Sequence, residues 1–207
     1  MALKHSYHLL APIYDTIVAN ATMSMRAKSL QRLGDTCDEA ILLMGVGTGL
    51  DFPLLPSGPS YTGIDITPAM LQKARNRLQP GLDITLDEGD VLNMPYAENH
   101  FDIVIMHLIL AVVPDPQGAL KEAERVVKPG GRILILDKFI RPGQVALMRR
   151  FINIFLRHIA TRTDVVFERL LFHTPSLKLM SDETAMAGGW FRYIEVRKDH
   201  SNLDQDR

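Results

Sequence analysis

The chain has 207 residues, 46% of them hydrophobic, which suits one α/β domain with a full core rather than two independent domains. Its single cysteine, Cys37, excludes a disulfide within the chain and fits a reducing compartment. The net charge is −1, but residues 35–137 hold fifteen acidic against seven basic side chains, and residues 138–207 hold twelve basic against eight acidic, so we expect surfaces with different partners.

Two helices are expected before the first strand. Residues 3–19 place five large apolar side chains on one side of a helix, and a second helix covers Met23–Leu33 and stops at Gly34. Because both precede the sheet, we expect them to cover the open edge where a ligand lies. The first residues contain no uninterrupted apolar run, so we expect no secretory signal. The apolar stretch Ile103–Val113, broken by His107, is too short to span a bilayer.

The central stretch of the sequence runs from Ile41 to Asp65. An apolar run, Ile41–Met44, stops at three glycines in the pattern GxGxG, and a second apolar run ends on Asp65. A crossover between parallel strands brings such a glycine turn and such an acid to one edge of the sheet, where ligands bind. Leu50 stands where a dinucleotide fingerprint would have its third glycine. We therefore expect a nucleoside without a pyrophosphate, with its ribose hydroxyls on Asp65.

The next elements are expected to alternate between helix and strand. The pattern predicts five strands and the helices between them, hence a doubly wound, mostly parallel, Rossmann-like α/β sheet. After the first two strands the expected elements are a helix over Thr67–Leu78, strands over Asp83–Asp87 and Phe101–Met106, a helix over Pro114–Val127 and a strand over Arg132–Asp137.

The C-terminal part predicts helices over Gln144–Ala160 and Val165–His173 and one strand over Trp190–Arg197. We therefore expect a sheet that lacks one C-terminal strand, or one that a second copy completes in a homodimer. Residues 1–198 are expected to form a single domain, made of covering helices (1–34), a ligand-binding core (35–138) and a basic helix with the last strand (139–198). Residues 199–207 read as a polar tail.

Several motifs in this order resemble class I S-adenosylmethionine-dependent methyltransferases over roughly residues 40–138. They are Gly45-Val46-Gly47-Thr48-Gly49, Asp65, Gly89-Asp90-Val91, Phe101–Val104 and Lys128–Gly131. The resemblance implies that the glycine turn faces the methionine part of the cofactor, that Asp65 binds the ribose, and that Asp90 accepts from the adenine amino group. Ile66 and Val91 would meet the adenine ring, and His107 would lie between cofactor and acceptor. We expect Asp102 to be a solvated residue beside its strand.

One position departs from the family pattern. Two residues before Gly45 the family usually has an acid, and this chain has Leu43. Losing a charge-assisted hydrogen bond there would weaken cofactor binding by about 1.5 to 3 kcal/mol unless another acid substitutes. Asp15, on the first covering helix, is our hypothetical substitute. The departure also leaves open a protein that binds the cofactor without catalysis.

The methyl acceptor is predicted from the residues around His107. His107, Tyr7 and Tyr14 are the candidate catalytic residues, since a base is needed only where the acceptor arrives protonated. No cluster with metal-ligand spacing occurs, so we expect no metal. Family members that methylate amino groups of bases carry an Asn/Asp-Pro-Pro-aromatic stretch where this chain has Met106–Ile109, so no nucleic-acid partner is expected.

A second resemblance favours a lipid as the methyl acceptor. Ala11-Pro12 before Tyr14-Asp15, the short helix Leu50–Leu55 and Val112–Pro116 are similar to small bacterial phosphatidylethanolamine N-methyltransferases, and also to quinone-ring C-methyltransferases. A soluble small-molecule acceptor is the third option. The apolar and cationic helix Gln144–Ala160 could lie on an anionic membrane surface, which predicts a cytoplasmic protein peripheral to the inner membrane face.

Overall fold

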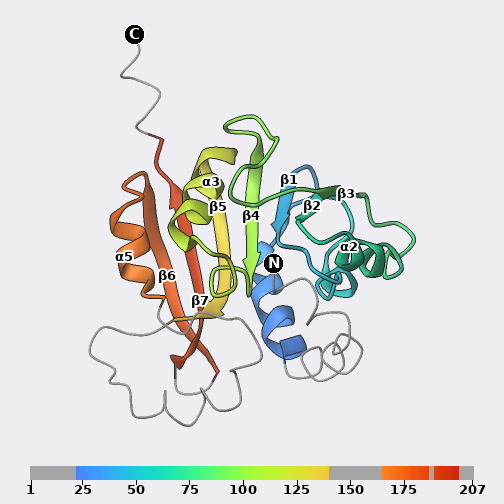
Figure 1. The fold of residues 1–207 in the computed structure, drawn as a ribbon, viewed down its shortest axis with the longest axis horizontal. Coiled ribbons are helices and arrows are strands. Elements are labelled where there is room, and N and C mark those ends of the chain that lie inside the picture. Colours follow the sequence, from blue (N-terminus) through green and yellow to red (C-terminus); the bar gives the residue numbers. More distant parts are fainter. Residues whose placement is uncertain (1–21, 140–164, 187–188, 201–207) are drawn as a thin grey trace.

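The computed structural model describes residues 22–139, 165–186 and 189–200. One seven-stranded sheet runs through these ranges in the order β3-β2-β1-β4-β5-β7-β6 (Figure 1). The pairs among β1 to β5 are parallel, and β7 is antiparallel to both β5 and β6, which confirms the expected Rossmann-like, mostly parallel sheet. The strands are β1 (Ala40–Met44), β2 (Ser60–Asp65), β3 (Ile84–Glu88), β4 (Phe101–His107), β5 (Val127–Lys138), β6 (Leu177–Met186) and β7 (Phe191–Lys198).

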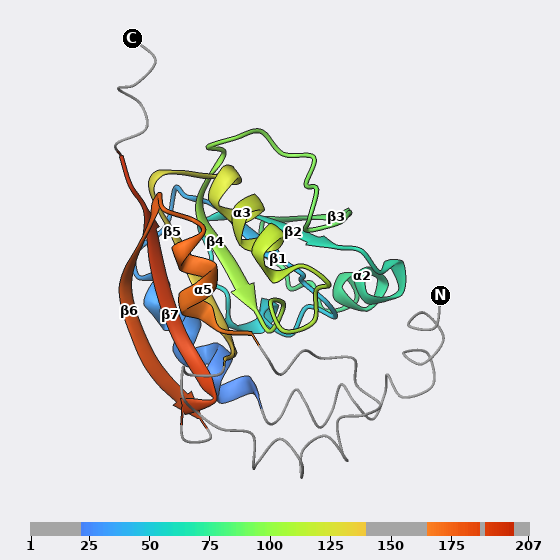
Figure 2. The ribbon, with the colours of Figure 1, turned by 60° about the vertical axis from the view of Figure 1, so that its left-hand side comes forward.

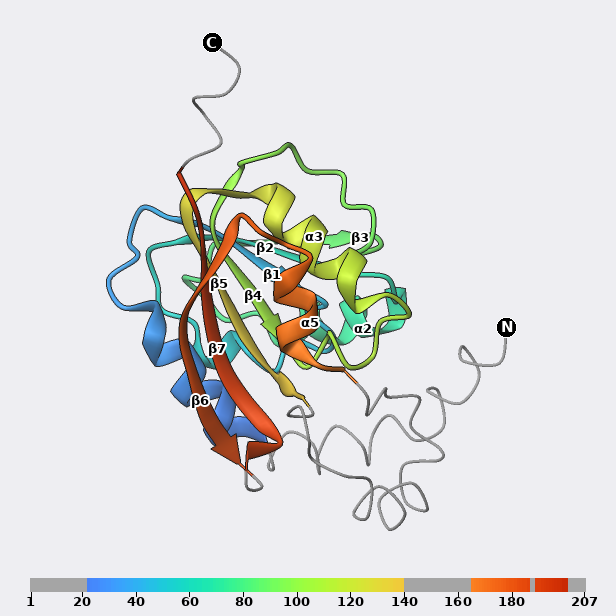
Figure 3. The ribbon, with the colours of Figure 1, turned by 90° about the vertical axis from the view of Figure 1, so that its left-hand side faces the viewer.

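Helices cover both faces of the sheet (Figures 2 and 3). A helix over residues 22–30 comes first, followed by η1 (Gln31–Leu33), η2 (Phe52–Leu54), α2 (Pro68–Arg75), α3 (Pro116–Val126) and α5 (Phe167–Phe172). The short helix expected over Leu50–Leu55 is confirmed as η2, which connects β1 to β2. The expected regular alternation is wrong in one place: residues 89–100 between β3 and β4 contain no helix, because that segment lacks an apolar repeat of helical period.

The strands are apolar throughout because both faces are buried. Ile41 and Leu43 point to the face covered by the helix over 22–30, η2 and α2, whereas Leu42 and Met44 point to the face covered by α3 and α5. All four side chains are at most 2% exposed. Continuous apolar runs of this kind are typical of parallel strands between two helical layers.

The expectation of a missing C-terminal strand is wrong. β6 pairs with β7 and completes a seven-stranded sheet within one chain, so no strand from a second copy is needed. β6 escaped detection because it is an edge strand with Leu177 as its one buried residue, and the rest of it reads KLMSDETAM without an apolar alternation. The helix expected over Val165–His173 and the last expected strand are confirmed as α5 and β7.

Asp102 is tied into the fold rather than solvated. Its carboxylate accepts from the backbone nitrogen of Ala40 at 3.0 Å and from the Lys128 ammonium at 2.7 and 2.8 Å. These bonds connect the beginnings of β1 and β4 to the turn that opens β5. The expectation of a solvated Asp102 is therefore wrong, and its place at the amino ends of the strands keeps it away from the ligand edge.

The strand order creates a switch point between β1 and β4. From β1 the chain moves outward to β2 and β3, and it then returns to the other side of β1 to form β4. Ligands of open α/β sheets bind outside the carboxyl ends of the strands at such a point. The glycine turn after β1, Asp65 at the end of β2 and His107 at the end of β4 all lie at this edge.

Candidate active site

The glycine turn has one position that is open towards a ligand. Gly45, Gly47 and Gly49 have φ values of +68°, +56° and +76°, a region that L side chains rarely adopt. A β-carbon at Gly45 would lie 2.4 Å from Ile109, and one at Gly49 would lie 2.6 Å from the Phe52 ring. At Gly47 the nearest atom would be a backbone oxygen 4.0 Å away. Gly45 and Gly49 therefore serve close packing, and Gly47 leaves room for a bound molecule.

Asp65 is held against this turn by backbone donors. Its Oδ2 accepts from the nitrogen of Gly47 at 2.8 Å, and its Oδ1 accepts from the nitrogen of Thr67 at 2.9 Å. A carboxylate has about four lone-pair positions, so two stay available for the vicinal hydroxyls of a ribose. The neighbouring Ile66 is 62% exposed and offers an apolar surface to a base. These residues fit an adenosyl group.

The loop after β3 completes this half of the edge. The nitrogen of Gly89 donates to the carbonyl oxygen of Asp65 at 3.1 Å, which holds the ends of β2 and β3 side by side. Oδ1 of the exposed Asp90 accepts from the nitrogen of Leu92 at 2.9 Å, so Oδ2 is available to a ligand. Val91 is buried, and its backbone lies between Asp90 and the apolar Leu92.

His107 belongs to a buried polar network on the face covered by the helix over 22–30. Its Nε2 lies 2.9 Å from Ser29 Oγ, and its Nδ1 lies 3.0 Å from Asp51 Oδ1. Nη1 of Arg26 donates to both oxygens of Asp51 at 2.9 Å. The residues Arg26, Ser29 and Asp51 were missed by sequence reasoning. For Asp51 the available signal was an acid placed inside the apolar segment Leu50–Leu55.

The charge on Asp51 is stabilised within this network. Burial by itself would raise the pKa of Asp51, but the neighbouring His107 and Arg26 hold it below its usual range. His107 is 5% exposed, and both of its ring nitrogens have partners inside the chain. The network thus fastens the covering helix to the segment after the glycine turn. A direct role for His107 in catalysis or cofactor binding stays a prediction.

Leu43 packs where the family pattern has an acid. It is 2% exposed and belongs to the core cluster on the same face as His107. Asp51 is a buried carboxylate on this face, shortly after the glycine turn, but its oxygens are bonded to Arg26 and His107 within the chain. Tyr7, Tyr14 and Asp15 lie outside the described residues.

Two unusual residues lie at the ends of β4 and β5. Leu108 has a φ of +58°, and its nitrogen donates to the carbonyl oxygen of Leu136 at 2.7 Å. A bulky residue in this region is uncommon, and such strain clusters at functional sites. Asp137 is 1% exposed and accepts from the nitrogens of Lys138 at 2.8 Å and Ala111 at 3.2 Å. Burial raises the pKa of Asp137 to about 6.

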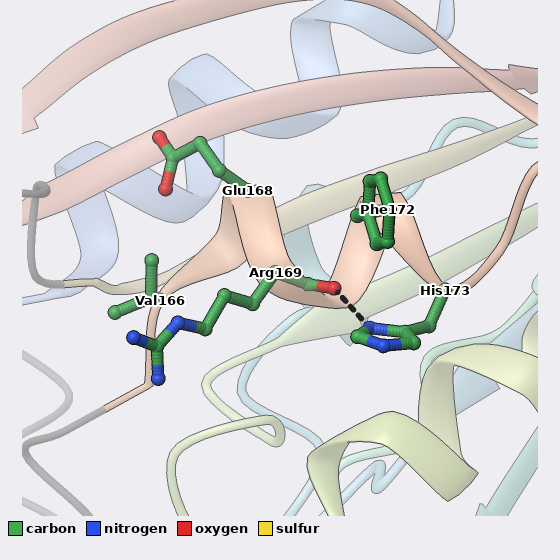
Figure 4. Close-up of a pocket in the computed structure, with 5 residues that line it drawn as sticks. All are labelled: Val166, Glu168, Arg169, Phe172 and His173. Carbon is green, nitrogen blue, oxygen red and sulfur yellow. Dashed lines mark hydrogen bonds between the residues drawn. The ribbon is translucent and has the colours of Figure 1, made fainter.

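A shallow pocket of about 330 Å³ lies elsewhere, on α5 (Figure 4). In it, Nδ1 of His173 donates to the carbonyl oxygen of Arg169 at 2.8 Å. It contains none of the predicted site residues, so we do not identify it with the cofactor site. Its lining residues are Val166, Glu168, Arg169, Phe172 and His173.

Comparisons with known proteins agree with this geometry. Residues 42–135 match the family model described as "Methyltransferase domain". The chain is 28% identical to a phosphatidylethanolamine N-methyltransferase of Cereibacter sphaeroides over 201 residues, which cover 95% of this chain and 98% of that protein. It is 37% identical to a demethylmenaquinone methyltransferase of Tropheryma whipplei over 169 residues, 77% of this chain and 67% of that protein.

A solved structure with a similar fold comes from a complex between the Haloferax volcanii Trm112 methyltransferase activator and a methyltransferase. The TM-score is 0.77 at 16% identity, with 95% of this chain and 98% of that chain covered. This likeness supports the fold alone. The open Gly47, the anchored Asp65 and the sequence relatives together lead to one assignment: the chain belongs to the class I S-adenosylmethionine-dependent methyltransferases.

Proposed function

We propose that this methyltransferase acts on the amino group of phosphatidylethanolamine. One observation carries the proposal: the chain aligns end to end with a phosphatidylethanolamine N-methyltransferase, over 95% of its own length and 98% of the relative's. The quinone-directed relative is more identical, at 37%, but a third of its length has no counterpart in the alignment. Agreement over the whole length includes the segments that flank the cofactor half, and we propose that those segments select the acceptor.

The chain's own residues would hold the cofactor at the glycine turn. Asp65 would accept hydrogen bonds from the ribose hydroxyls, and Asp90 would accept one from the adenine amino group. Ile66 would cover the adenine ring. When bound, S-adenosylmethionine supplies a methyl group that its sulfonium already activates. The protein then has to align the acceptor nitrogen and exclude water from it.

An amine acceptor also needs a place for its proton. An alkylamine with a pKa of about 10.4 is protonated at neutral pH. Because its pKa lies about 3 units above that pH, removing the proton costs about 4 to 5 kcal/mol. We propose Tyr7, Tyr14 and His107 as the groups around this amine. In the described structure His107 would have to give up its bond to Ser29 or to Asp51 before it could accept a proton.

Quinone-ring C-methylation is the alternative, and the 37% identity to a demethylmenaquinone methyltransferase favours it. Isotopic methyl transfer into phosphatidylethanolamine vesicles, demethylmenaquinol and a panel of soluble amines separates the two. Label in the phospholipid alone supports the proposal, and label in the quinol alone overturns it. Cofactor binding with no acceptor labelled would instead identify a non-catalytic binding protein.

Two variants make this assay specific. Asp65→Asn removes one ribose acceptor and should raise the Kd for S-adenosylhomocysteine about tenfold, the loss expected for one charge-assisted hydrogen bond. Asp83→Asn is the matched control, because Asp83 is exposed before β3 at the opposite end of the strand. Equal cofactor affinity in both variants would remove Asp65 from the proposed site.

We further propose that the protein acts at the cytoplasmic face of a membrane. Within the ranges that the structure describes, no helix is long and apolar enough to cross a bilayer. The basic apolar segment Gln144–Ala160 lies outside those ranges and is our candidate for surface binding. Co-sedimentation should increase when phosphatidylglycerol replaces phosphatidylcholine in the vesicles, and it should weaken in high salt. Absence of binding at every salt concentration would contradict the membrane proposal.

A further inference from the structure

Lys138 lies at the carboxyl end of β5, across β4 from the residues proposed to bind the adenosine. It is the last residue of β5 and pairs with Phe191 of β7. Two residues earlier, Leu136 pairs with His107 and packs under the covering helix against Met25. Side chains alternate along a strand, so Lys138 points to the same face as Leu136 and His107. Its side chain therefore leaves the sheet on that face at the carboxyl end of β5.

The ammonium of Lys138 has no partner among the residues that the structure describes. Arg26, Arg192 and Lys198 are buried basic side chains, and each donates a hydrogen bond within the chain: Arg26 to Asp51, Arg192 to Glu168, and Lys198 to Asn99. Lys138 is partly buried without such a bond. Burial lowers the pKa of Lys138, although the neighbouring Asp137 acts in the opposite direction. A partly desolvated cation is stabilised by a nearby anion.

The strand order places Lys138 away from the glycine turn. β4 separates β5 from β1, so at a strand spacing of about 4.8 Å β5 lies about 10 Å from the strand that carries the glycine turn. Gly47, Asp65 and Asp90 all lie on the β1 to β3 side. Lys138 therefore stands on the side of the edge that the cofactor-binding residues leave to the acceptor.

We propose that Lys138 binds the phosphate of a phospholipid headgroup and so selects a phospholipid acceptor over a quinone ring. The inference rests on the proposed function, which it deepens by naming the chemical group that is recognised. In an ethanolamine phospholipid two carbons join the amine to the phosphodiester, so a cation beside the site can hold the phosphate while the amine faces the methyl donor. A quinone ring carries no such anion.

The test measures headgroup binding as well as turnover. Lys138→Gln removes the charge, Lys138→Arg keeps it, and Lys121→Gln removes the charge of an exposed lysine on α3 as the matched control. The probe is glycerophosphoethanolamine, titrated calorimetrically into protein loaded with S-adenosylhomocysteine. Lys138→Gln should raise its Kd, and the KM for phosphatidylethanolamine in mixed micelles, about tenfold or more. Lys138→Arg and Lys121→Gln should stay within about threefold of the starting protein, and the affinity for S-adenosylhomocysteine should be equal in all variants.

Each contrary result has a distinct meaning. Unchanged binding of the headgroup by a folded Lys138→Gln overturns the contact, and so does starting protein that binds no glycerophosphoethanolamine while it methylates demethylmenaquinol. In that last case the methyltransferase assignment stands and the phospholipid acceptor fails. Loss of S-adenosylhomocysteine affinity would assign Lys138 to the cofactor instead. Inorganic phosphate that binds as tightly as the headgroup would reduce the site to a general anion site.

Discussion

Gly47 combines a backbone that disfavours side chains with open space where a β-carbon would be. We predict that Gly47→Ala lowers the free energy of unfolding by about 1 kcal/mol, the cost of an alanine in the left-handed region. Its methyl group would also occupy ligand space, so the Kd for S-adenosylhomocysteine should rise at least about tenfold. Calorimetric titration and chemical denaturation measure the two effects.

Gly34 provides the control for that variant. It has a φ of +71°, and a β-carbon added there would meet no atom within 4 Å, but it precedes β1 at the far end of the strand. Gly34→Ala should cost at least about 1 kcal/mol, because its ψ of −146° lies in a region that only glycine adopts readily, and it should leave cofactor affinity unchanged. Equal affinity in both variants would show that Gly47 does not face the cofactor.

Asp137 predicts a pH dependence of stability. Its pKa is about 6 in the folded chain against 3.8 in the unfolded chain, so the folded state binds the proton more tightly. The free energy of unfolding should therefore fall as the pH rises through this interval, by about 2 to 3 kcal/mol between about pH 4 and pH 7. Urea denaturation at each pH gives the free energy of unfolding of the protein and of Asp137→Asn. The difference between the two isolates the contribution of Asp137, because all other carboxylates titrate in both proteins. Parallel pH profiles would contradict the prediction.

At the scale of elements, Arg26 fastens the covering helix to the glycine turn. Arg26→Met removes the guanidinium that donates to both oxygens of the buried Asp51 carboxylate, which should cost about 3 kcal/mol. Backbone amides over residues 22–30 should then exchange with solvent faster, as hydrogen exchange with mass spectrometry measures. Lys28→Met is the control on the same helix, because Lys28 is exposed and should cost less than about 1 kcal/mol.

The double variant separates charge from packing. When Arg26→Met is combined with Asp51→Asn, the unpaired buried charge is gone, so part of the lost stability should return. A double variant whose cost equals the sum of the two single costs would show that the two residues act independently.

At the scale of the whole molecule, one chain contains the complete sheet and every described residue of the proposed cofactor site. Arg192 holds the C-terminal hairpin to the helical layer, because its Nη2 donates to Glu168 of α5 and its guanidinium also pairs with Asp182 of β6. Because the whole sheet lies within one chain, a monomer should bind the cofactor as tightly as any oligomer.

Sedimentation velocity in the presence of S-adenosylhomocysteine shows which oligomeric state carries the bound ligand. Binding by a dimer alone would contradict the prediction.

The local patterns were sufficient for the cofactor half. Three features of this half lie within a short stretch of chain: the apolar run Ile41–Met44, the glycine turn and Asp65. Each can be recognised in the sequence without the others, as an apolar strand, a set of closely spaced glycines and an acid at the end of a strand. Their arrangement at one edge then follows from the handedness of the crossover. β5 begins at Val127 rather than at the predicted Arg132. β6 was missed altogether, because its edge position removes the burial pattern on which such predictions depend.

The network of Arg26, Asp51 and His107 and the position of the Lys138 amine were decided by the tertiary structure alone. In the sequence each is an isolated polar residue, and its partners lie many positions away: Arg26 and Asp51 are 25 positions apart, and Asp51 and His107 are 56 positions apart. A repeat along the chain reports which face of an element is buried. It does not report which polar groups from different elements meet there, because that depends on how the layers pack.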